Sequence, residues 1–339
     1  MNTTTFSAFK KVASAACGLA LISVLAPRPA ASQDKVEGLE LLERVGTYQG
    51  ELHTHFAAVP TAAELGQRAK LGAVLGRGSG ISFEGEPLQL SETRTALTSP
   101  VDPSASFEVD STTGNFLFNG GLLKYRKDAS TPNLPQDAEL PRLALSLLRS
   151  HGLAVDPKQM ELAHVGGLNM AITDDGEKSQ IFQKLKTVRF ARTLDGLPVE
   201  GDGRIVMHLG EAGALAGVVF QWPRLEKSML LEPEMLQKPE ALRTRALDEI
   251  RSMAAKSERA RLTRASLVLY DDGKGVLEPA YHFILERYMD QGEHELVMIP
   301  YDFYLPATTK PLAFYPHMEV APVAPADGKN EDADEQTDD

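Results

Sequence analysis

Residues 187–217 read TVRFARTLDGLPVEGDGRIVMHLGEAGALAG. The first part alternates apolar and polar residues, which is typical of a β-strand with one buried face. This pattern predicts that Val188 and Phe190 lie on one face of the strand and that Arg189 and Arg192 lie on the other.

Two turns interrupt the apolar pattern. The first is at Asp195–Gly196, and the second, at 210–213, follows another alternating run at 205–209 and leads to apolar sequence as far as Trp222. Alternating runs joined by Gly- and Asp-containing turns predict an antiparallel meander with one solvated face.

An amphipathic helix is predicted before the meander. Apolar residues recur at helical spacing between Leu140 and Leu148, and Gly152 stands where helices often end in a left-handed residue. The sequence also predicts a β-hairpin at 106–127 and a strand at 160–172. Residues 101–225 are therefore expected to form one helix-plus-antiparallel-sheet unit.

The same order recurs in residues 226–305. After a link at 225–238, Pro239 can open a helix. Strands are then predicted at 265–270, 280–287 and 295–301. The apolar face of this helix comprises Leu242, Ala246, Leu247, Ile250 and Met253. Two consecutive helix-plus-antiparallel-sheet units predict an α+β fold instead of a parallel α/β fold.

The first 32 residues are typical of an export signal. Lys10 and Lys11 precede a short apolar run, and small residues at 30–32 offer a cleavage site. Cys17 lies in this segment and is the one cysteine of the sequence, so the exported chain is expected to have no disulfide. We therefore expect a secreted or periplasmic protein without stable membrane insertion after cleavage.

The regions flanking the two units give weaker patterns. Residues 33–100 are predicted to be a poorly defined extension with helical spacing at 36–45 and 62–75 and a Gly-rich loop at 76–80. Residues 306–339 are Pro-rich and then acidic, and we expect them to be a disordered tail.

The composition excludes some partners. The chain is 42% hydrophobic and 24% charged, which is typical of a globular protein, and its formal net charge is -12. Residues 1–32 carry three basic residues and no acidic one, so residues 33–339 carry a net charge of -15. Such a surface repels nucleic acid and anionic lipid.

Two motifs resemble a known family. Arg189-Phe190, followed by Gly196-Leu197-Pro198-Val199 and Gly201, is similar to the propeptide pattern of thermolysin and fungalysin precursors. The run Glu278–Phe283 (EPAYHF) resembles a strand of the PepSY domain that follows in that family. Arg192 and Leu194 depart from the family pattern, which often has Gln and an aromatic residue there.

The resemblance, which covers residues 107–301, implies cystatin-like and PepSY-like folds. In the family such units act as an intramolecular chaperone and inhibitor of the zinc peptidase behind them. It therefore implies a binding module whose protein partner is a secreted metallopeptidase. The residues that it places at the partner surface are Arg189, Arg192, Gly196, Pro198, Val199, Gly201 and Tyr281.

No peptidase motif accompanies these units. The run His294–Met298 (HELVM) has Met where the zinc-binding H-E-x-x-H needs its second His, so we expect no peptidase activity, no catalytic residue and no cofactor. The turn-forming pairs Asp174–Asp175 and Asp271–Asp272, and Ser79 in its Gly-rich run, do not indicate catalysis.

Two alternatives stay open at the level of the sequence. His53 and His55 form an H-x-H pair, with which some metal-dependent hydrolases begin their sites. Such an enzyme would need further His and Asp ligands at the ends of successive strands. The other alternative is a scaffold protein of the cell envelope.

Overall fold

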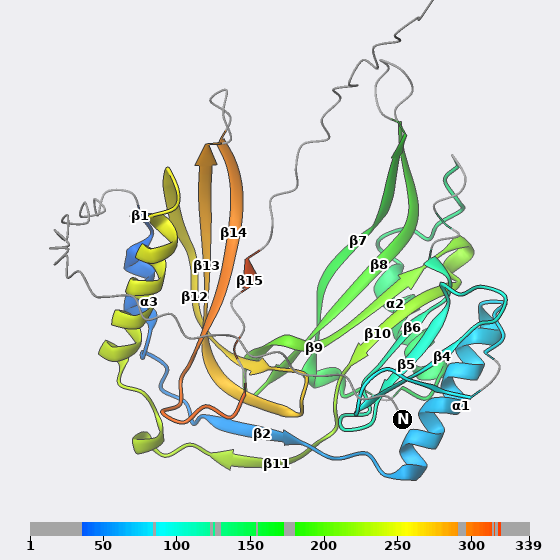
Figure 1. Ribbon diagram of the computed structural model, residues 1–339, viewed down its shortest axis with the longest axis horizontal. Coiled ribbons are helices and arrows are strands. Elements are labelled where there is room, and N and C mark those ends of the chain that lie inside the picture. Colours follow the sequence, from blue (N-terminus) through cyan, green and yellow to red (C-terminus); the bar gives the residue numbers. More distant parts are fainter. Residues whose placement is uncertain are drawn as a thin grey trace, which may run out of the picture.

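The computed structural model describes residues 36–83, 86–122, 125, 130–153, 155–172, 180–290, 296–313, 315 and 318–319. Helices pack against a large, mostly antiparallel sheet, so the predicted α+β class is confirmed. Figure 1 shows two parts side by side, with strands β2 and β11 running below them. We call these parts the α2 unit and the α3 unit, and the region between them the junction.

The α2 unit has a continuous strand ladder in the order β7–β8–β9–β10–β6–β5–β4–β3. Its elements are α1 (Ala62–Gly78), β3 (Leu88–Gln89), β4 (Arg94–Thr98), β5 (Ser106–Asp110), β6 (Phe116–Asn119), α2 (Leu140–Ser150), β7 (Met160–Ile172), β8 (Gln180–Leu194), β9 (Leu197–Leu209) and β10 (Leu215–Gln221).

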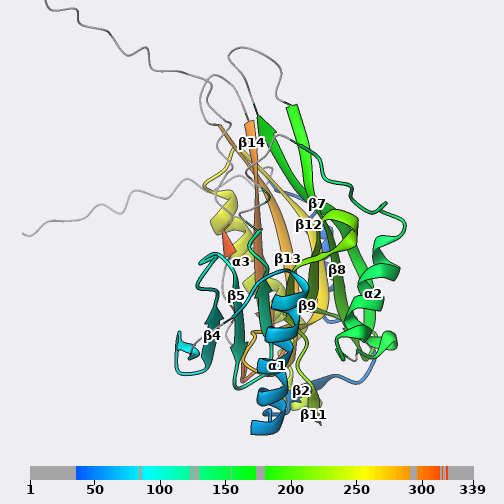
Figure 2. The ribbon, with the colours of Figure 1, turned by 90° about the vertical axis from the view of Figure 1, so that its right-hand side faces the viewer.

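Helices α1 and α2 both pack on one face of this ladder. Leu140, Ala144 and Leu148 follow one another at intervals of four residues along α2 and pack against Phe190 and other apolar residues of the sheet. Gly152 has the predicted left-handed conformation (φ 70°) after the helix end. Helix α1 lies in front in Figure 2, with α2 to its right.

Helix α1 has a strong local start signal. The Thr61 side chain accepts a hydrogen bond from the Glu64 N–H, and the Glu64 carboxylate accepts one from the Thr61 N–H. This capping box fixes the N-terminus of a helix that the spacing at 62–75 predicts. The helix continues to Gly78, so most of the predicted loop at 76–80 belongs to its last turn.

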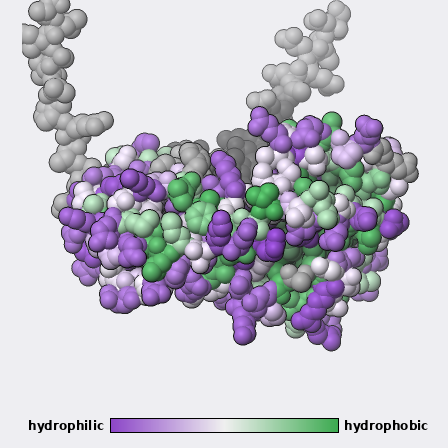
Figure 3. Space-filling view, turned by 90° about the horizontal axis from the view of Figure 1, so that it is seen from below, coloured by the Kyte–Doolittle hydropathy of each residue, from purple (hydrophilic) through white to green (hydrophobic). Residues whose placement is uncertain are grey.

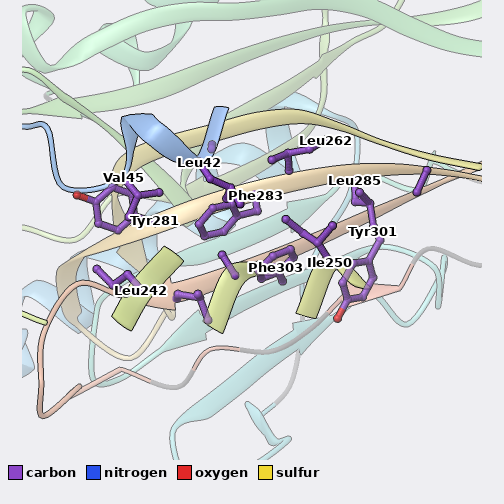
Figure 4. Packing of buried hydrophobic residues seen from close by; sticks show 14 of the residues in the cluster. Leu42, Val45, Leu242, Ile250, Leu262, Tyr281, Phe283, Leu285, Tyr301 and Phe303 are labelled. Carbon is purple, nitrogen blue, oxygen red and sulfur yellow. The ribbon is translucent and has the colours of Figure 1, made fainter. Parts of the chain in front are cut away.

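The α3 unit packs helix α3 (Pro239–Ala254) on one face of three long strands. These strands are β12 (Arg259–Asp271), β13 (Val276–Asp290) and β14 (Leu296–Pro306). Leu242, Ala246 and Ile250 are buried on the predicted face of α3. Figure 4 shows Leu242 and Ile250 of the helix close to Phe283 and Phe303 of the sheet.

The N-terminal segment completes this core. Residues 36–45 do not form the predicted α-helix, because Gly38 is left-handed (φ 80°) and separates β1 (Val36–Glu37) from the 3₁₀ helix η2 (Leu39–Arg44). Strand β1 pairs in parallel with β12. Leu42 and Val45 are buried in the same cluster as Phe283 (Figure 4).

The predicted extension 33–100 is therefore not one region. Residues 36–45 belong to the α3 unit, and residues 62–78 belong to the α2 unit. Between them, β2 (His53–Ala57) pairs with β13 and with β11 (Leu225–Leu230). Strand β11 occupies the stretch that the sequence predicts as a link.

A parallel contact joins the two units. Val199, Glu200 and Gly201 of β9 pair with residues 269–271 of β12. We expected two separate antiparallel sheets, but this contact makes their strands one sheet. The buried apolar residues of the junction are Leu52, Leu194, Leu197, Val199, Leu231, Leu269 and Leu277.

The predicted tail is ordered at its start. Strand β14 ends at Pro306, Thr308 forms a bridge with Leu236, and β15 (Met318–Glu319) pairs with β14. The predicted start of the disordered tail at residue 306 is therefore corrected. The first part of this segment packs on the α3 unit through contacts that its amino-acid composition does not reveal. Residues 320–339 lie outside the described residues.

The predicted signal at 1–32 and Cys17 also lie outside the described residues. Among the described residues, no helix is both long and apolar enough to cross a membrane.

Candidate functional site

The predicted partner-binding residues are divided between surface and interior. Arg189 and Gly196 are exposed, and Pro198 and Gly201 are half-buried. Val199 is buried in the junction. The structure therefore does not gather the motif residues on one surface.

Tyr281 is buried in the core of the α3 unit. Its hydroxyl accepts a hydrogen bond from the Gly46 N–H at 2.8 Å. In this structure Tyr281 fastens the N-terminal segment to the sheet, and it is 5% exposed.

The two glycines of the motif have different roles. Gly196 follows Asp195 in the β8–β9 turn, where both residues have positive φ (77° and 50°), and a Cβ at Gly196 would meet open space. Gly201 also has a positive φ (85°), but a Cβ there would lie 2.2 Å from the backbone oxygen of Asp271. Gly201 thus permits the close parallel contact of β9 with β12.

Arg192 lies in the interior and not on the solvated face where we expected it. Its side chain is 4% exposed. The alternation of side chains along a strand explains this burial. Arg192 is two residues from Phe190 and four from Val188, and it therefore shares their buried face. The sequence pattern contained this signal.

Neutral groups hold the buried guanidinium. Arg192 donates from Nε and Nη2 to Gln159 Oε1, at 3.3 and 3.0 Å, and from Nη1 to the Pro223 backbone oxygen at 3.0 Å. It also lies 5.0 Å from the centre of the Trp222 ring. Burial lowers the pKa of Arg192 to about 10, although the nearby Asp271 carboxylate opposes this shift.

A cavity of about 680 Å³ opens beside Arg192. Helix α1 contributes Arg68 and Leu71 to its wall, and the segment after α2 contributes His151 and Leu153. Trp222 and Phe220 form part of its apolar wall. The sequence did not predict this cavity because its walls come from segments far apart in the chain.

The junction also buries an acidic group. Asp271 is 1% exposed, and burial raises the pKa of its carboxyl to about 7. The Gly273 N–H donates to Asp271 Oδ1 and lowers this pKa, as does Arg192, whereas the charges of Asp202 and Asp272 raise it. Asp271 and Arg192 are therefore two buried ionisable groups with perturbed pKa values, and such groups are common at functional sites.

The raised pKa predicts how stability depends on pH. The folded state holds the Asp271 proton more tightly than the unfolded state, so this residue costs stability as pH rises from about 4 to about 7. We expect Asp271→Asn to be more stable than the wild type at pH 8, by roughly 1–2 kcal/mol, and nearly equal to it at pH 4. Urea denaturation at both pH values measures the difference. A variant that is less stable at pH 8 would show that the charged form is favoured through Arg192.

His53 and His55 lie together on β2, next to the β8–β9 turn. His53 Nδ1 and His55 Nε2 are 3.4 and 3.0 Å from the same oxygen, Oδ2 of Asp195. Burial lowers the pKa of His55, and Asp195 offsets this only in part. Within the part of the chain that the structure describes, no group of three or more His, Cys, Asp or Glu residues is arranged to hold a metal ion.

A second ionic cluster lies on the other side of β12 and β13 from α3. Glu200 Oε2 is 2.5 Å from His282 Nδ1, and Glu200 Oε1 is 2.5 Å from Arg264 Nη2. Burial alone would lower the pKa of His282, but the Asp302 and Glu200 carboxylates beside the ring outweigh it and raise this pKa. With Asp302 the cluster spans four strands, so it could be found only once their register was known.

Two further sequence features have little bearing on the site. The Ser79 hydroxyl donates to the Leu215 backbone oxygen at 2.9 Å, which is a structural contact. Asp174, Asp175, His294 and Glu295 lie outside the described residues.

Strand β7 presents a free edge. It pairs with β8 along its whole length, and no other strand pairs with it among the described residues. Its sequence, MELAHVGGLNMAI, contains neither Lys, Arg nor Pro, the residues that commonly protect edge strands. Register shifts flank the regular stretch His164–Leu168, in which Gly166 and Gly167 carry no side chain.

Among known proteins, a likeness is found to solved structures. No family model matches the chain, and no curated protein matches it. The structure is similar to the crystal structure of an uncharacterized protein from Eubacterium rectale ATCC 33656, with a TM-score of 0.45 and 10% sequence identity. The match covers 80% of this chain and 86% of that one.

Proposed function

We propose that this protein is an exported, non-catalytic binding module that inhibits a secreted peptidase or assists its folding. In this proposal residues 101–225 act as a propeptide-like, cystatin-like unit and residues 226–305 as a PepSY-like unit. The motif resemblance supplies the class of partner. The free edge of β7 is the observation that carries the proposal.

An edge of this kind can receive an extended segment of another protein. Unpaired N–H and C=O groups on an edge strand bind a partner strand through backbone hydrogen bonds, and neighbouring side chains select the register. The stretch His164–Leu168 supports this mode, because it pairs with β8 without a register shift and so presents a regular edge. The edge of β14, in contrast, is partly covered by β15 of the same chain.

The test introduces lysines on β7, because a lysine on an edge strand opposes pairing with another strand. In Ala163→Lys/Asn169→Lys the two lysines flank the stretch His164–Leu168, at positions whose side chains are exposed. We expect this variant to weaken inhibition, or binding, of the cognate peptidase at least tenfold (about 1.4 kcal/mol), because a lysine at the edge opposes strand pairing. Secreted peptidases purified from the same organism are titrated with the protein, and their hydrolysis of a fluorogenic peptide is measured.

The control carries the same added charge elsewhere. Thr244→Lys/Ser252→Lys places two lysines on the exposed face of α3 and should bind as the wild type does. If no secreted peptidase binds, the proposed function is wrong. If a peptidase binds both variants equally, β7 is not the binding edge.

A further inference from the structure

The cavity beside Arg192 has an excess of positive charge. Arg192 has five N–H donors, of which the described residues engage three, all with neutral acceptors. Asp271 acts on it electrostatically but forms no ion pair with it. A buried cation without a paired anion is costly, so such a group is expected to meet an anion.

A second cation lines the same cavity. The Arg68 guanidinium lies 5.4 Å from the ring centre of Phe116 and 5.3 Å from that of Phe220. It forms no ion pair within the described residues, and Glu64 acts on it only through its electrostatic field. Arg68 and Arg192 are therefore both open to an anion in the cavity.

The acidic residues of the wall are already engaged. Glu64 closes the capping box of α1 and lies 3.5 Å from Arg224 Nη2. Asp156 accepts a hydrogen bond from the Lys158 N–H. Neither carboxylate forms an ion pair with Arg68 or Arg192 within the described residues. With Arg224, the wall carries three guanidinium groups against these two carboxylates.

The rest of the wall is suited to an apolar body. Leu71, Leu153, Val155, Phe220 and Trp222 line the cavity, and its volume lies within the usual range for small-molecule sites. Guanidinium groups bind carboxylates through two parallel hydrogen bonds, and aromatic walls exclude water from that contact. A bare inorganic anion would leave the apolar wall without a partner.

We propose that this cavity binds an organic carboxylate, with the carboxylate at Arg68 and Arg192 and the apolar part against Phe220 and Trp222. The ligand is either a free acid or the C-terminal residue of a peptide. This site is separate from the β7 edge and does not depend on the peptidase proposal.

Trp222 reports on binding directly, because it is the one tryptophan of the sequence and lines the cavity. Its fluorescence is followed while the full chain is titrated with 4-phenylbutanoate and with the matched amide, 4-phenylbutanamide. A short peptide ending in Phe is tested in parallel with a free and an amidated C-terminus. We expect saturable binding of at least one acid, and at least tenfold weaker binding of its amide. The acid that binds identifies the source of the ligand.

Arg68→Met supplies the test of the site itself. It removes the charge from a partly exposed residue of α1, so the fold should survive, and we expect affinity for the acid to fall at least tenfold. Arg77→Met removes a charge from the same helix away from the cavity and should leave the affinity unchanged. Equal binding of acid and amide, no saturable binding at millimolar concentrations, or an unaltered affinity in Arg68→Met would overturn the proposal.

Discussion

A Gly201→Ala variant should lose about 3 kcal/mol or more of its free energy of unfolding. Gly201 has a φ of 85°, a region that costs an L-residue roughly 1–2 kcal/mol. The new Cβ would also lie 2.2 Å from the backbone oxygen of Asp271, and backbone cannot move aside as a side-chain end can. Strands β9 and β12 must therefore separate, which opens the junction. Urea denaturation measures the loss.

Gly196→Ala is the matched control. Gly196 has a similar φ of 77°, but a Cβ there has no atom within 4 Å. This variant should therefore lose only the backbone cost, about 1 kcal/mol. Equal losses in the two variants would show that the β9–β12 contact is not as close as described. Hydrogen exchange at residues 269–271 tests the same point, since Gly201→Ala should deprotect these amides and Gly196→Ala should not.

A Glu278→Ala variant should release the C-terminal segment. The Glu278 carboxylate is fully buried and accepts hydrogen bonds from the Leu312 and Ala313 N–H groups and from the Tyr315 hydroxyl, the last at 2.7 Å. Hydrogen bonds to a charged group contribute about 1.5–3 kcal/mol each, so losing several should cost roughly 3 kcal/mol or more. Chymotrypsin should then cut after Leu312 much faster than in the wild type.

The comparison variant is on the same strand. Glu286→Ala removes a half-buried carboxylate whose described hydrogen bond is from the Tyr288 hydroxyl, at 3.2 Å. It should lose less than about 1 kcal/mol and should leave the cleavage rate near the wild-type value. If Glu278→Ala keeps the wild-type resistance to chymotrypsin, the segment is held by other contacts.

Local patterns predicted the elements whose signals lie within a few neighbouring residues. Helices α2 and α3 bury residues spaced as in a helix, and the β8–β9 hairpin turns at Asp195–Gly196, as the sequence predicts. The stretch 36–45 was misassigned because Gly38 and pairing with β12 override its helical spacing. Strand β11, LEKSML, shows no clear period, so its pairing with β2 is decided by distant residues.

The candidate site was less predictable than the fold. Arg192 is part of the family motif, and its spacing of two residues from Phe190 places it on the buried face of β8. The cavity, the raised pKa of Asp271 and the Glu200–His282 contact depend on strands and helices that meet only in three dimensions. No spacing along the chain encodes these approaches, because each joins residues that are far apart in sequence.

The position of the N-terminal segment sets an order of assembly. A chain is synthesised from its N-terminus, and Leu42 and Val45 leave the ribosome long before α3 and β14, against which they pack. The α2 unit has all its described core residues once Trp222 has been made, whereas the α3 unit must wait for β14 to be completed at Pro306. Residues 36–45 thus stay without the rest of the α3-unit core through most of translation. A truncation that removes these residues would damage the core of the α3 unit.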